Sequence, residues 1–392
     1  MPSYQGVDFL NIDSFLSDEE KLVRQTVRRF VDEQVNPSIE EWNREGRFPL
    51  HLVKPMAELG FLGAGLSGYG GSGMNSVQYG LVMQELERGD SGLRSFVSVQ
   101  SALVIYPIST YGSEEQKKRW LPRLSSGEAI GCFGLTEPDF GSNPAGMRTR
   151  AVKDGDFYVL NGEKTWITSG SIAEVALIWA RLGEANGVVR GFLVEKGTPG
   201  FVAQDIHGKH SLRASVSSSL SLGEVRVPAA NMLPKAEGMK GPLSCLTQGR
   251  YGIGWGTLGA AMACYHEALE FTKARKQFGN KPIAGHQLVQ EQLVEMVTEI
   301  SKGQLLALHV GRLKDEGRLD SAHASLLKRN NTRMALQVAR AARDLLGANG
   351  ITSDYSVFRH MANLESVATY EGTHNIHTLI LGQKITGIPA YE

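Results

Sequence analysis

Two changes of hydrophobic period divide this chain into three stretches. From about residue 131 to 234, short β-type runs alternate with turn residues, whereas the residues before and after them have helical spacing. The β-type runs are Phe157–Leu160, Lys164–Ile167, Val175–Trp179, Gly191–Val194 and Val225–Val227. The pairs Asp154-Gly155 and Asn161-Gly162 separate neighbouring runs, as in an antiparallel sheet. The sequence therefore predicts an α+β fold, with a helical domain at 1–130, an antiparallel β domain at 131–237 and a second helical domain at 238–392.

Helix start signals support this division. Ser17 to Glu20 form a capping box, and the apolar residues that follow keep helical spacing until Pro37. Ser113 to Gln116 repeat the same signal. Helices are also expected at Val53–Leu59, Ser76–Glu87, Ser113–Pro122 and Gln287–Lys314.

Composition excludes several classes of protein. Among 392 residues, 42% are hydrophobic and 21% charged, which is typical of a globular chain with a sizeable core. The 41 basic and 41 acidic side chains cancel, so no long-range field favours nucleic acid or anionic lipid. Three cysteines are too few for a disulfide framework and lack metal-site spacing. The longest apolar run, Gly252–Tyr265, is too short to span a bilayer, and no targeting segment is recognisable. We expect a cytoplasmic protein without nucleic-acid, membrane or metal partners, although a processed mitochondrial matrix protein fits equally well.

Two segments near the β-type runs suit a flat ligand. The amides and hydroxyls of Thr136 and Ser142 lie in the turn-rich stretch from Cys132 onward and could bind the edge of a planar heterocycle. An ordinary domain linker has the same composition. Trp166 beside Thr168 could cover such a ring, but a tryptophan in a strand is also typical of a core.

Two further segments, Arg275–Gly279 and Leu346–Gly350, suit a pyrophosphate. Glycine lets the main chain approach closely, and arginine provides a bidentate cation. The alternative for the second segment is a plain helix C-cap at Gly347. No G-x-G-x-x-G or P-loop motif is present, so the familiar nucleotide folds are not supported.

The segment Tyr370–Asn375 carries the strongest chemical signal. Thr373 is placed to cap the helix that follows, so one interpretation is a simple helix–helix corner. Glu371, however, precedes a glycine at this bend and could point into a closed cavity. A carboxylate in an apolar cavity has a raised pKa and can act as a general base.

In this order and spacing, these segments resemble the acyl-CoA dehydrogenase family along essentially the whole chain. Within the family the chain is most similar to the members that oxidise and decarboxylate glutaryl-CoA. The residues that carry the resemblance are Glu85–Ser95, Gly131–Pro138, Lys164–Thr168, Arg250–Ala260, Arg275–Gly279, Leu345–Gly350 and Thr369–Ile388.

The resemblance implies a C-terminal four-helix bundle, a homotetramer and one FAD per subunit. It implies that six residues surround the isoalloxazine ring: Phe133, Leu135, Thr136, Ser142, Trp166 and Thr168. A second set would contact the pyrophosphate and adenosine of a neighbouring subunit's FAD: Arg275, Phe278, Gln287, Leu346, Gly347 and Gly350. Thr373 and Asn375 would close over the cofactor.

The resemblance also implies the chemistry. Glu371 would remove the α-proton of the thioester while the β-hydride passes to flavin N5, and the Glu371 amide with the ribityl 2′-hydroxyl would stabilise the thioester oxygen. Arg94 would bind the distal carboxylate of glutaryl-CoA. Loss of CO2 and return of the proton from Glu371 would then give crotonyl-CoA. An electron-transfer flavoprotein is the expected electron acceptor, and lysine and tryptophan degradation the expected pathway.

The resemblance implies further substrate-binding residues around Glu371 and Arg94. Glu87, Ser95, Ser98 and Tyr370 would shape the acyl pocket, while Arg250 and the main chain near Ser142 would contact CoA. From the residues alone, a surface ion pair is the favoured interpretation of Glu87 and Arg94, and it would contribute under about 1 kcal/mol to stability. Only the resemblance to the family reverses that preference.

Several alternatives remain. A short-chain acyl-CoA dehydrogenase or oxidase on this fold would not decarboxylate, and would not need Arg94. An enzyme that stops at glutaconyl-CoA would need Arg94, so only its product distinguishes it. Some relatives of the fold bind DNA, but balanced charge disfavours that reading. A binding role without catalysis would leave Glu371 unexplained.

Overall fold

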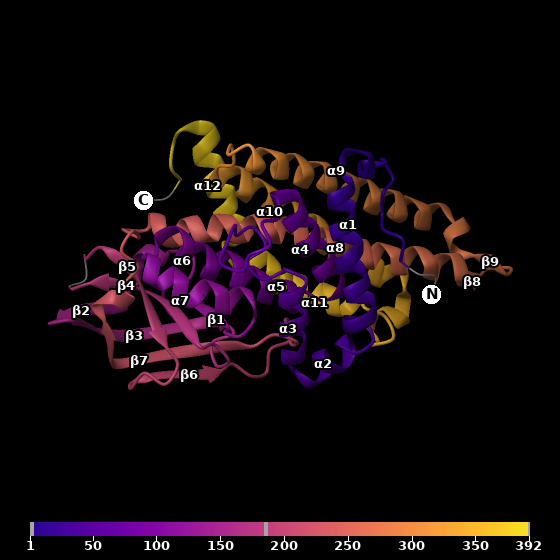
Figure 1. Cartoon of the computed structure of the whole chain (residues 1–392). Helices are drawn as coiled ribbons and strands as arrows, with labels where there is room; N and C mark the ends of the chain where they lie inside the picture. The colour runs from indigo at the N-terminus through magenta and orange to yellow at the C-terminus, as the bar shows by residue number, and fades with distance from the viewer. Residues whose placement is uncertain (1–3, 184–186, 391–392) are drawn as a thin grey trace.

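Helices precede and follow one β-sheet along the chain (Figure 1). The computed structural model describes residues 4–183 and 187–390. The helices before the sheet are α1 (Asp18–Phe30), α2 (Ile39–Glu45), α3 (Val53–Glu58), α4 (Ser76–Gly89), α5 (Ser91–Ser98), α6 (Tyr106–Tyr111) and α7 (Glu114–Ser125). Those after it are α8 (Lys240–Ala274), α9 (Gln287–Asp315), α10 (Ser321–Leu345), α11 (Val357–Thr369) and α12 (His374–Thr386). The predicted α+β organisation is confirmed.

The predicted helix starts are confirmed by side-chain caps. Ser17 caps α1, Ser113 caps α7 and Thr373 caps α12, each accepting a hydrogen bond from a main-chain N–H of the first turn. Helix α7 runs through Pro122 to Ser125, slightly beyond the predicted end. Helix α5 and the π-helical turns that follow it at Val99–Ile105 have no counterpart among the predicted helices.

The sheet is mixed, which corrects the expectation of a purely antiparallel one. Its strands are β1 (Gly131–Gly134), β2 (Arg150–Asp154), β3 (Phe157–Thr168), β4 (Val175–Leu182), β5 (Val189–Glu195), β6 (Phe201–Asp205) and β7 (Ser217–Pro228). They follow the order β1-β4-β2-β3-β7-β6, with β5 on the other side of β4. Strands β1 and β2 run parallel to β4. The long connections from β1 and β2 to β4 allow this, since parallel neighbours need a crossover and not a tight turn.

One of the two predicted turns is also corrected. Asp154 and Gly155 do turn between β2 and β3. Asn161 and Gly162, in contrast, lie inside β3, where the pairing with β7 shifts register between Leu160 and Gly162. The two predicted strands on either side of this bulge are therefore one strand.

The long helix α8 forms the centre of the helical part, packed against α4, α9 and α10. Glycines on α8 allow α4 to approach it very closely: a Cβ atom at Gly259 would stand 1.8 Å from the main-chain oxygen of Gln84 on α4. A second core lies where α6 and α7 meet the sheet. None of the described helices is long and apolar enough to cross a lipid bilayer.

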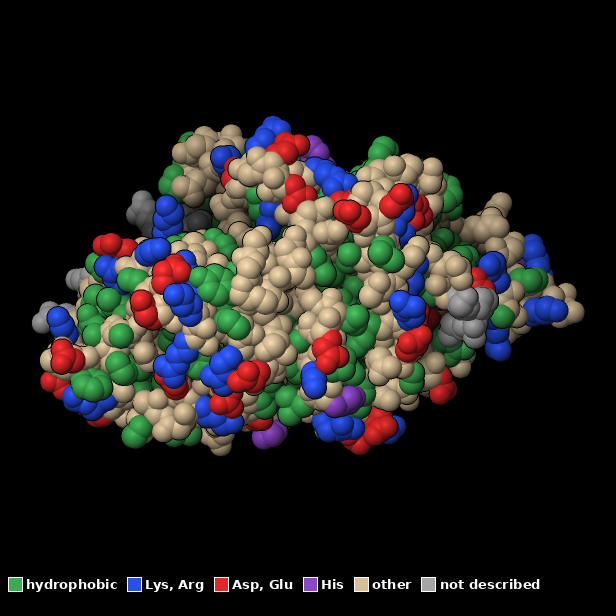
Figure 2. All heavy atoms as spheres, in the orientation of Figure 1, with side chains coloured by type: hydrophobic (Ala, Val, Ile, Leu, Met, Phe, Trp, Pro, Cys, Tyr) green, Lys and Arg blue, Asp and Glu red, His purple; other side chains and the backbone are tan. Residues whose placement is uncertain are grey.

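Charges of both signs are interspersed on the face of the molecule that Figure 2 shows. No basic patch of the kind that follows a nucleic-acid backbone gathers there. This view gives no support to the DNA-binding alternative.

Candidate active site

Glu371 lies in the short link between α11 and α12, in a left-handed backbone conformation with φ of 51°. Its carboxylate rests against Gly249 of α8, where a Cβ atom would come within 2.1 Å of Oε2. Oε2 is enclosed and has no hydrogen-bond partner among the described residues. Burial raises the pKa of Glu371 above that of an ordinary carboxyl. The predicted inward-pointing carboxylate is what the geometry provides.

Two cations hold the main chain on both sides of Glu371. Lys328 Nζ on α10 donates to the carbonyl of Gly372 at 2.5 Å and also to the carbonyl of Tyr370. Arg250 Nε on α8 donates to the carbonyl of Glu371 at 2.8 Å. Three consecutive carbonyls are therefore fixed by side chains from two helices, which defines the direction of the carboxylate between them.

Arg94 and Glu87 form a buried ion pair, so the surface reading of this pair is wrong. Arg94 Nε lies 2.6 Å from Glu87 Oε2, and the two side chains are 1% and 0% exposed. Ser91 Oγ donates to the other Glu87 oxygen at 2.9 Å. The pair rests on Gly256 of α8, where a Cβ atom would stand 2.1 Å from Glu87 Oε2. Local sequence could not show this, because the burial comes from a helix far along the chain.

Tyr370 connects this ion pair to the Glu371 link. Arg94 Nη2 donates to the Tyr370 hydroxyl, and the guanidinium carbon lies 5.6 Å from the centre of the Tyr370 ring. The next helical residues on α5, Ser95 and Ser98, are also buried. The structure thus brings Glu371, Tyr370, Arg94, Glu87 and Arg250 into one connected cluster, called the acyl cluster below.

Two residues of this region were missed by the sequence analysis, Lys328 and Tyr79. Lys328 shares the buried face of α10 with Ala324, Asn331 and Ala335. A lysine on the apolar stripe of an amphipathic helix is unusual, and that was an available signal. Tyr79 gave none, because nearly all of α4 is buried. Its hydroxyl lies over Gly252 and, like Ser98 Oγ, is enclosed without a hydrogen-bond partner in the part of the chain described.

The residues predicted around a flat ring lie on the sheet and the loop after β1. Trp166 is 63% exposed and has a φ of 59° at the bulged end of β3, so the core reading of this tryptophan is wrong. Thr168 is half-buried beside it on β3, whereas Phe133 and Leu135 are buried. The half-buried Thr136 joins the two segments, since its carbonyl accepts from the amide of Thr165 at 2.9 Å. Ser142 is exposed.

The second predicted set lies elsewhere. Arg275 is the C-cap of α8, and Phe278 is the 88% exposed tip of a hairpin formed by β8 (Lys276–Gln277) and β9 (Lys281–Pro282). This hairpin projects from the end of the molecule opposite the sheet (Figure 1). Gln287 begins α9, while Leu346 caps α10 before the helical turn at Gly347–Ile351, which includes Gly350. One subunit does not bring these residues to the acyl cluster. Of the last predicted pair, Thr373 caps α12 and Asn375 is exposed in its first turn.

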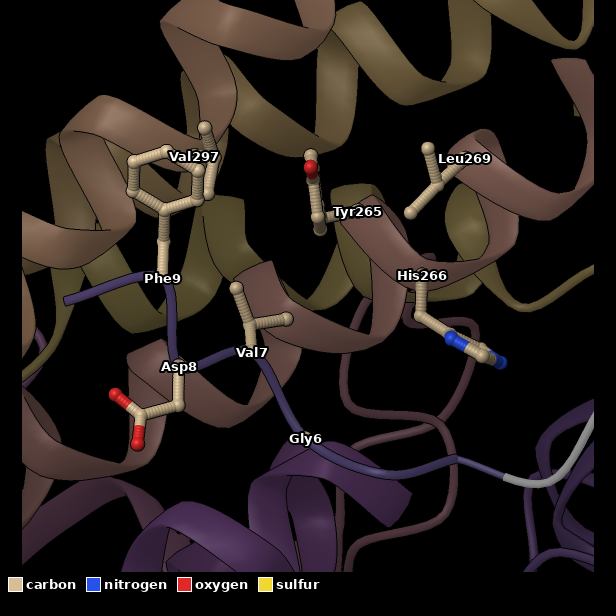
Figure 3. Close-up of a pocket in the computed structure, with 8 residues that line it drawn as sticks. All are labelled: Gly6, Val7, Asp8, Phe9, Tyr265, His266, Leu269 and Val297. Carbon is tan, nitrogen blue, oxygen red and sulfur yellow. The ribbon is translucent and has the colours of Figure 1, made fainter. Parts of the chain in front are cut away.

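A hollow of about 270 Å³ lies under the N-terminal segment, between α8 and α9 (Figure 3). Val7 and Phe9 form one side of it, and Tyr265, Leu269 and Val297 the other. None of the predicted site residues lines this hollow. The predicted catalytic and binding residues therefore lie away from this hollow.

Comparison with known proteins agrees with the resemblance found in the sequence. Residues 17–128, 132–225 and 236–386 match the N-terminal, middle and C-terminal domains of acyl-CoA dehydrogenase. The chain belongs to the acyl-CoA dehydrogenase family. This acyl-CoA dehydrogenase is 34% identical to the glutaryl-CoA dehydrogenase of Desulfococcus multivorans, over 96% of this chain and 99% of the other. It is also 34% identical to the short-chain specific acyl-CoA dehydrogenase of Clostridium acetobutylicum, over 95% and 100%.

A solved structure gives the same family. The glutaryl-CoA dehydrogenase of Mycobacterium smegmatis in complex with FADH2 superposes with a TM-score of 0.97 and 51% identity, covering both chains completely. The family is FAD-dependent, so this acyl-CoA dehydrogenase is a flavoprotein oxidoreductase with FAD as its cofactor. The residues present fit that group. The exposed indole of Trp166 on a left-handed backbone, with the half-buried Thr168 two residues further along β3, is a surface for a flat ring.

Proposed function

We propose that this acyl-CoA dehydrogenase oxidises and decarboxylates glutaryl-CoA to crotonyl-CoA and CO2. The observation that carries the proposal is the buried cation Arg94. It donates a hydrogen bond to the hydroxyl of Tyr370, the residue directly before Glu371. A short acyl chain that begins at Glu371 would meet this cation at its far end. The similarity to two glutaryl-CoA dehydrogenases supports the same substrate.

Arg94 would offset the main free-energy cost of binding a dicarboxylic substrate. A second carboxylate in a desolvated pocket is costly unless a cation meets it. A guanidinium has five N–H donors, and those on Nε and Nη2 contact Glu87 and Tyr370. Donors therefore remain for a carboxylate. The enclosed hydroxyls of Ser98 and Tyr79 provide further donors in the same region.

Glu371 is the proposed base. Its carboxyl has a raised pKa because it is buried, so the ionised form accepts a proton more readily than an exposed carboxylate does. It would take the acidic α-proton of the thioester, while its own main-chain amide would donate to the thioester oxygen as negative charge develops there. When bound at Trp166 and Thr168, FAD supplies the acceptor for the hydride from the β-carbon.

The second half of the reaction uses the same carboxyl group. Oxidation places a double bond between the α- and β-carbons, so the distal carboxylate sits on the γ-carbon, which is attached to a double bond conjugated with the thioester. When the bond to CO2 breaks, its electron pair is delocalised to the thioester oxygen. Glu371, now protonated, would return its proton to the γ-carbon and give crotonyl-CoA. Tyr370 and Arg94 would flank that carbon and keep water from it.

The remaining assignments follow the family pattern. Arg250 and the main chain at Ser142 would contact CoA. Phe133, Leu135 and Thr136 would complete the isoalloxazine site, with Thr373 and Asn375 closing over it. In a homotetramer, the exposed residues of the hairpin and of the Gly347 turn would reach the pyrophosphate and adenosine of a neighbouring subunit's FAD. An electron-transfer flavoprotein would then reoxidise the cofactor.

The deciding experiment is anaerobic mixing of the yellow holoenzyme with glutaryl-CoA, followed by an artificial electron acceptor and mass analysis of the products. Bleaching with release of crotonyl-CoA and CO2 is expected. Glutaconyl-CoA as the product would keep the oxidation and remove the decarboxylation. Bleaching by butyryl-CoA but not by glutaryl-CoA would favour the short-chain activity of the Clostridium relative and overturn the proposal.

A further inference from the structure

Lys328 is a fully buried lysine that neither the cofactor assignment nor the substrate assignment uses. Its side chain comes from α10, and its ammonium contacts the two carbonyls on either side of Glu371. Burying an ammonium group is costly, and a neutral side chain would be cheaper if packing were its only role. The charge itself therefore requires an explanation.

The backbone geometry at the link gives the first part of that explanation. Glu371 and Gly372 both have positive φ, 51° and 101°. A left-handed conformation at a residue other than glycine costs free energy and persists only where surrounding contacts enforce it. Lys328 and Arg250 enforce it here, because together they hold the carbonyls of residues 370, 371 and 372.

The charges around Glu371 give the second part. The titratable and charged groups that face the link are Lys328 on α10, Arg250 and Cys245 on α8, Arg94 on α5, Tyr79 on α4, Tyr370 beside it, and His374 and His377 on α12. Burial holds the pKa of His377 well below its usual value, so this imidazole is neutral. Arg94 is already paired with Glu87. Burial lowers the pKa of Lys328 to about 7 against the opposing effect of the Glu371 carboxylate, so Lys328 is a cation below that pH. Among the nearby charges, Lys328 lowers the pKa of Glu371 most strongly, against the opposing effect of burial.

We propose that Lys328 is a positioning residue for the reaction: its ammonium fixes the Glu371 link in its left-handed conformation and supplies the positive charge that keeps the carboxylate ionised. The inference rests on the proposed role of Glu371 as the base. It adds α10 to a site otherwise built from α4, α5, α8 and the link between α11 and α12.

Three substitutions of Lys328 separate the two roles. Lys328→Gln keeps N–H donors for the carbonyls and loses the charge, whereas Lys328→Met loses both. Lys328→Arg keeps both the positive charge and the N–H donors. The matched control is Arg329→Met, which removes a positive charge from the next residue of α10. Arg329 lies on the exposed side of that helix, where its Nε donates to Thr378 Oγ1 at 2.9 Å.

The measurement is the pH dependence of α-hydrogen exchange with D2O in the holoenzyme. The probe is an acyl-CoA with sulfur in place of the β-carbon, which can lose an α-proton but has no β-hydride to give. For Lys328→Gln we expect the midpoint of the acid limb to rise by about 1 pH unit or more, since a nearby cation typically lowers a carboxyl pKa by about 1–3 units. The plateau rate at high pH should remain close to that of the unmodified protein.

Lys328→Met should raise the midpoint equally and also lower the plateau, while Lys328→Arg and Arg329→Met should keep the original midpoint. An unchanged midpoint in Lys328→Gln, with exchange intact in the unmodified protein, overturns this inference alone. Absence of exchange in the unmodified protein overturns the base role of Glu371, and this inference with it. If Lys328→Met does not fold, Lys328→Gln and Lys328→Arg still decide the question.

Discussion

Glu371 combines a strained backbone with a buried acid. A left-handed conformation outside glycine costs about 1–3 kcal/mol, and here it turns the carboxylate toward Gly249 rather than toward solvent. Burial adds a raised pKa. Both effects favour one outcome, a carboxylate that is directed at a fixed point and that binds a proton readily. Neither would be selected for stability alone.

Replacing Glu371 by glutamine tests the base. The amide has the same shape but cannot accept the α-proton, so we expect bound FAD to remain while reduction by substrate slows by about 10²-fold or more. Stopped-flow absorbance of the flavin band measures this directly. Full turnover in Glu371→Gln would remove Glu371 from the reaction.

The acid limb of the pH profile gives a second measure of the same residue. Because burial raises the pKa of Glu371, the carboxyl stays protonated to a higher pH than an exposed glutamate does. We expect kcat/KM to fall as the pH drops through this raised pKa. A profile that falls only near the pH where exposed glutamates titrate would show that the base is not buried when substrate binds.

The charge of Arg94 should determine substrate preference. Removing Arg94 alone would leave Glu87 buried and unpaired, which costs about 3–5 kcal/mol, so the informative variant is Arg94→Met combined with Glu87→Gln. We expect its kcat/KM for glutaryl-CoA to fall about 30-fold or more relative to butyryl-CoA, equivalent to about 2 kcal/mol. Equal losses on both substrates would show that Arg94 does not bind the distal carboxylate.

At the scale of the element, α8 presents a stripe of glycines to the site. Gly249, Gly252, Gly256 and Gly259 are spaced by three, four and three residues, which places them on one face of the helix. They lie under the Glu371 carboxylate, the Tyr79 hydroxyl, the Glu87–Arg94 pair and the main chain of α4, respectively. The acyl cluster can approach α8 this closely only because no Cβ atom intervenes.

Gly256→Ala is therefore expected to displace Glu87 and Arg94, since the new methyl group would stand 2.1 Å from Glu87 Oε2. Activity on glutaryl-CoA and the melting temperature should both fall. The control is Gly382→Ala in α12, where no atom lies within 4 Å of the added Cβ. There alanine should be neutral or stabilising by up to about 1 kcal/mol, because it is the better helix former. Similar melting temperatures for both variants would contradict the close-packing argument.

Elements with strong local signals were predicted from the sequence, and those determined by tertiary contacts were not. The capping boxes at Ser17 and Ser113 fix helix starts locally. Helix α5 was missed because its serines and Gly92 are poor helix formers, and burial against α8 and Ala214 overrides that preference. Asn161 and Gly162 have the composition of a turn, yet pairing along β7 keeps both inside β3.

The same limit applies to the site. Glu371 was predicted because a carboxylate beside glycine at a helix corner is a local feature. The burial of Arg94 and the participation of Lys328 depend on α8 and α10 meeting the Glu371 link, and no short window of sequence contains those contacts. The exposure of Trp166 likewise follows from a register shift between β3 and β7.

At the scale of the whole molecule, the residues expected to bind FAD occupy opposite ends. The sheet carries one set, and the hairpin with Phe278 carries part of the other (Figure 1). If the hairpin completes the site of a neighbouring subunit, flavin retention depends on assembly. We expect dilution of the holoenzyme to release fluorescent flavin as the subunits separate, and Phe278→Ser to raise the concentration at which this occurs. Analytical ultracentrifugation run in parallel should show both changes together; flavin release without dissociation would contradict the shared site.

Helix α8 joins these two ends. Its 35 residues extend about 50 Å, with the floor of the acyl cluster in its first half and the hairpin directly after its C-cap. Removing one residue between Gly259 and Ala274 would rotate everything beyond it by about 100° and turn the hairpin to another side. Natural variants of this chain should thus keep the length of that segment invariant, while changes of side chain are confined to the positions outside the buried core.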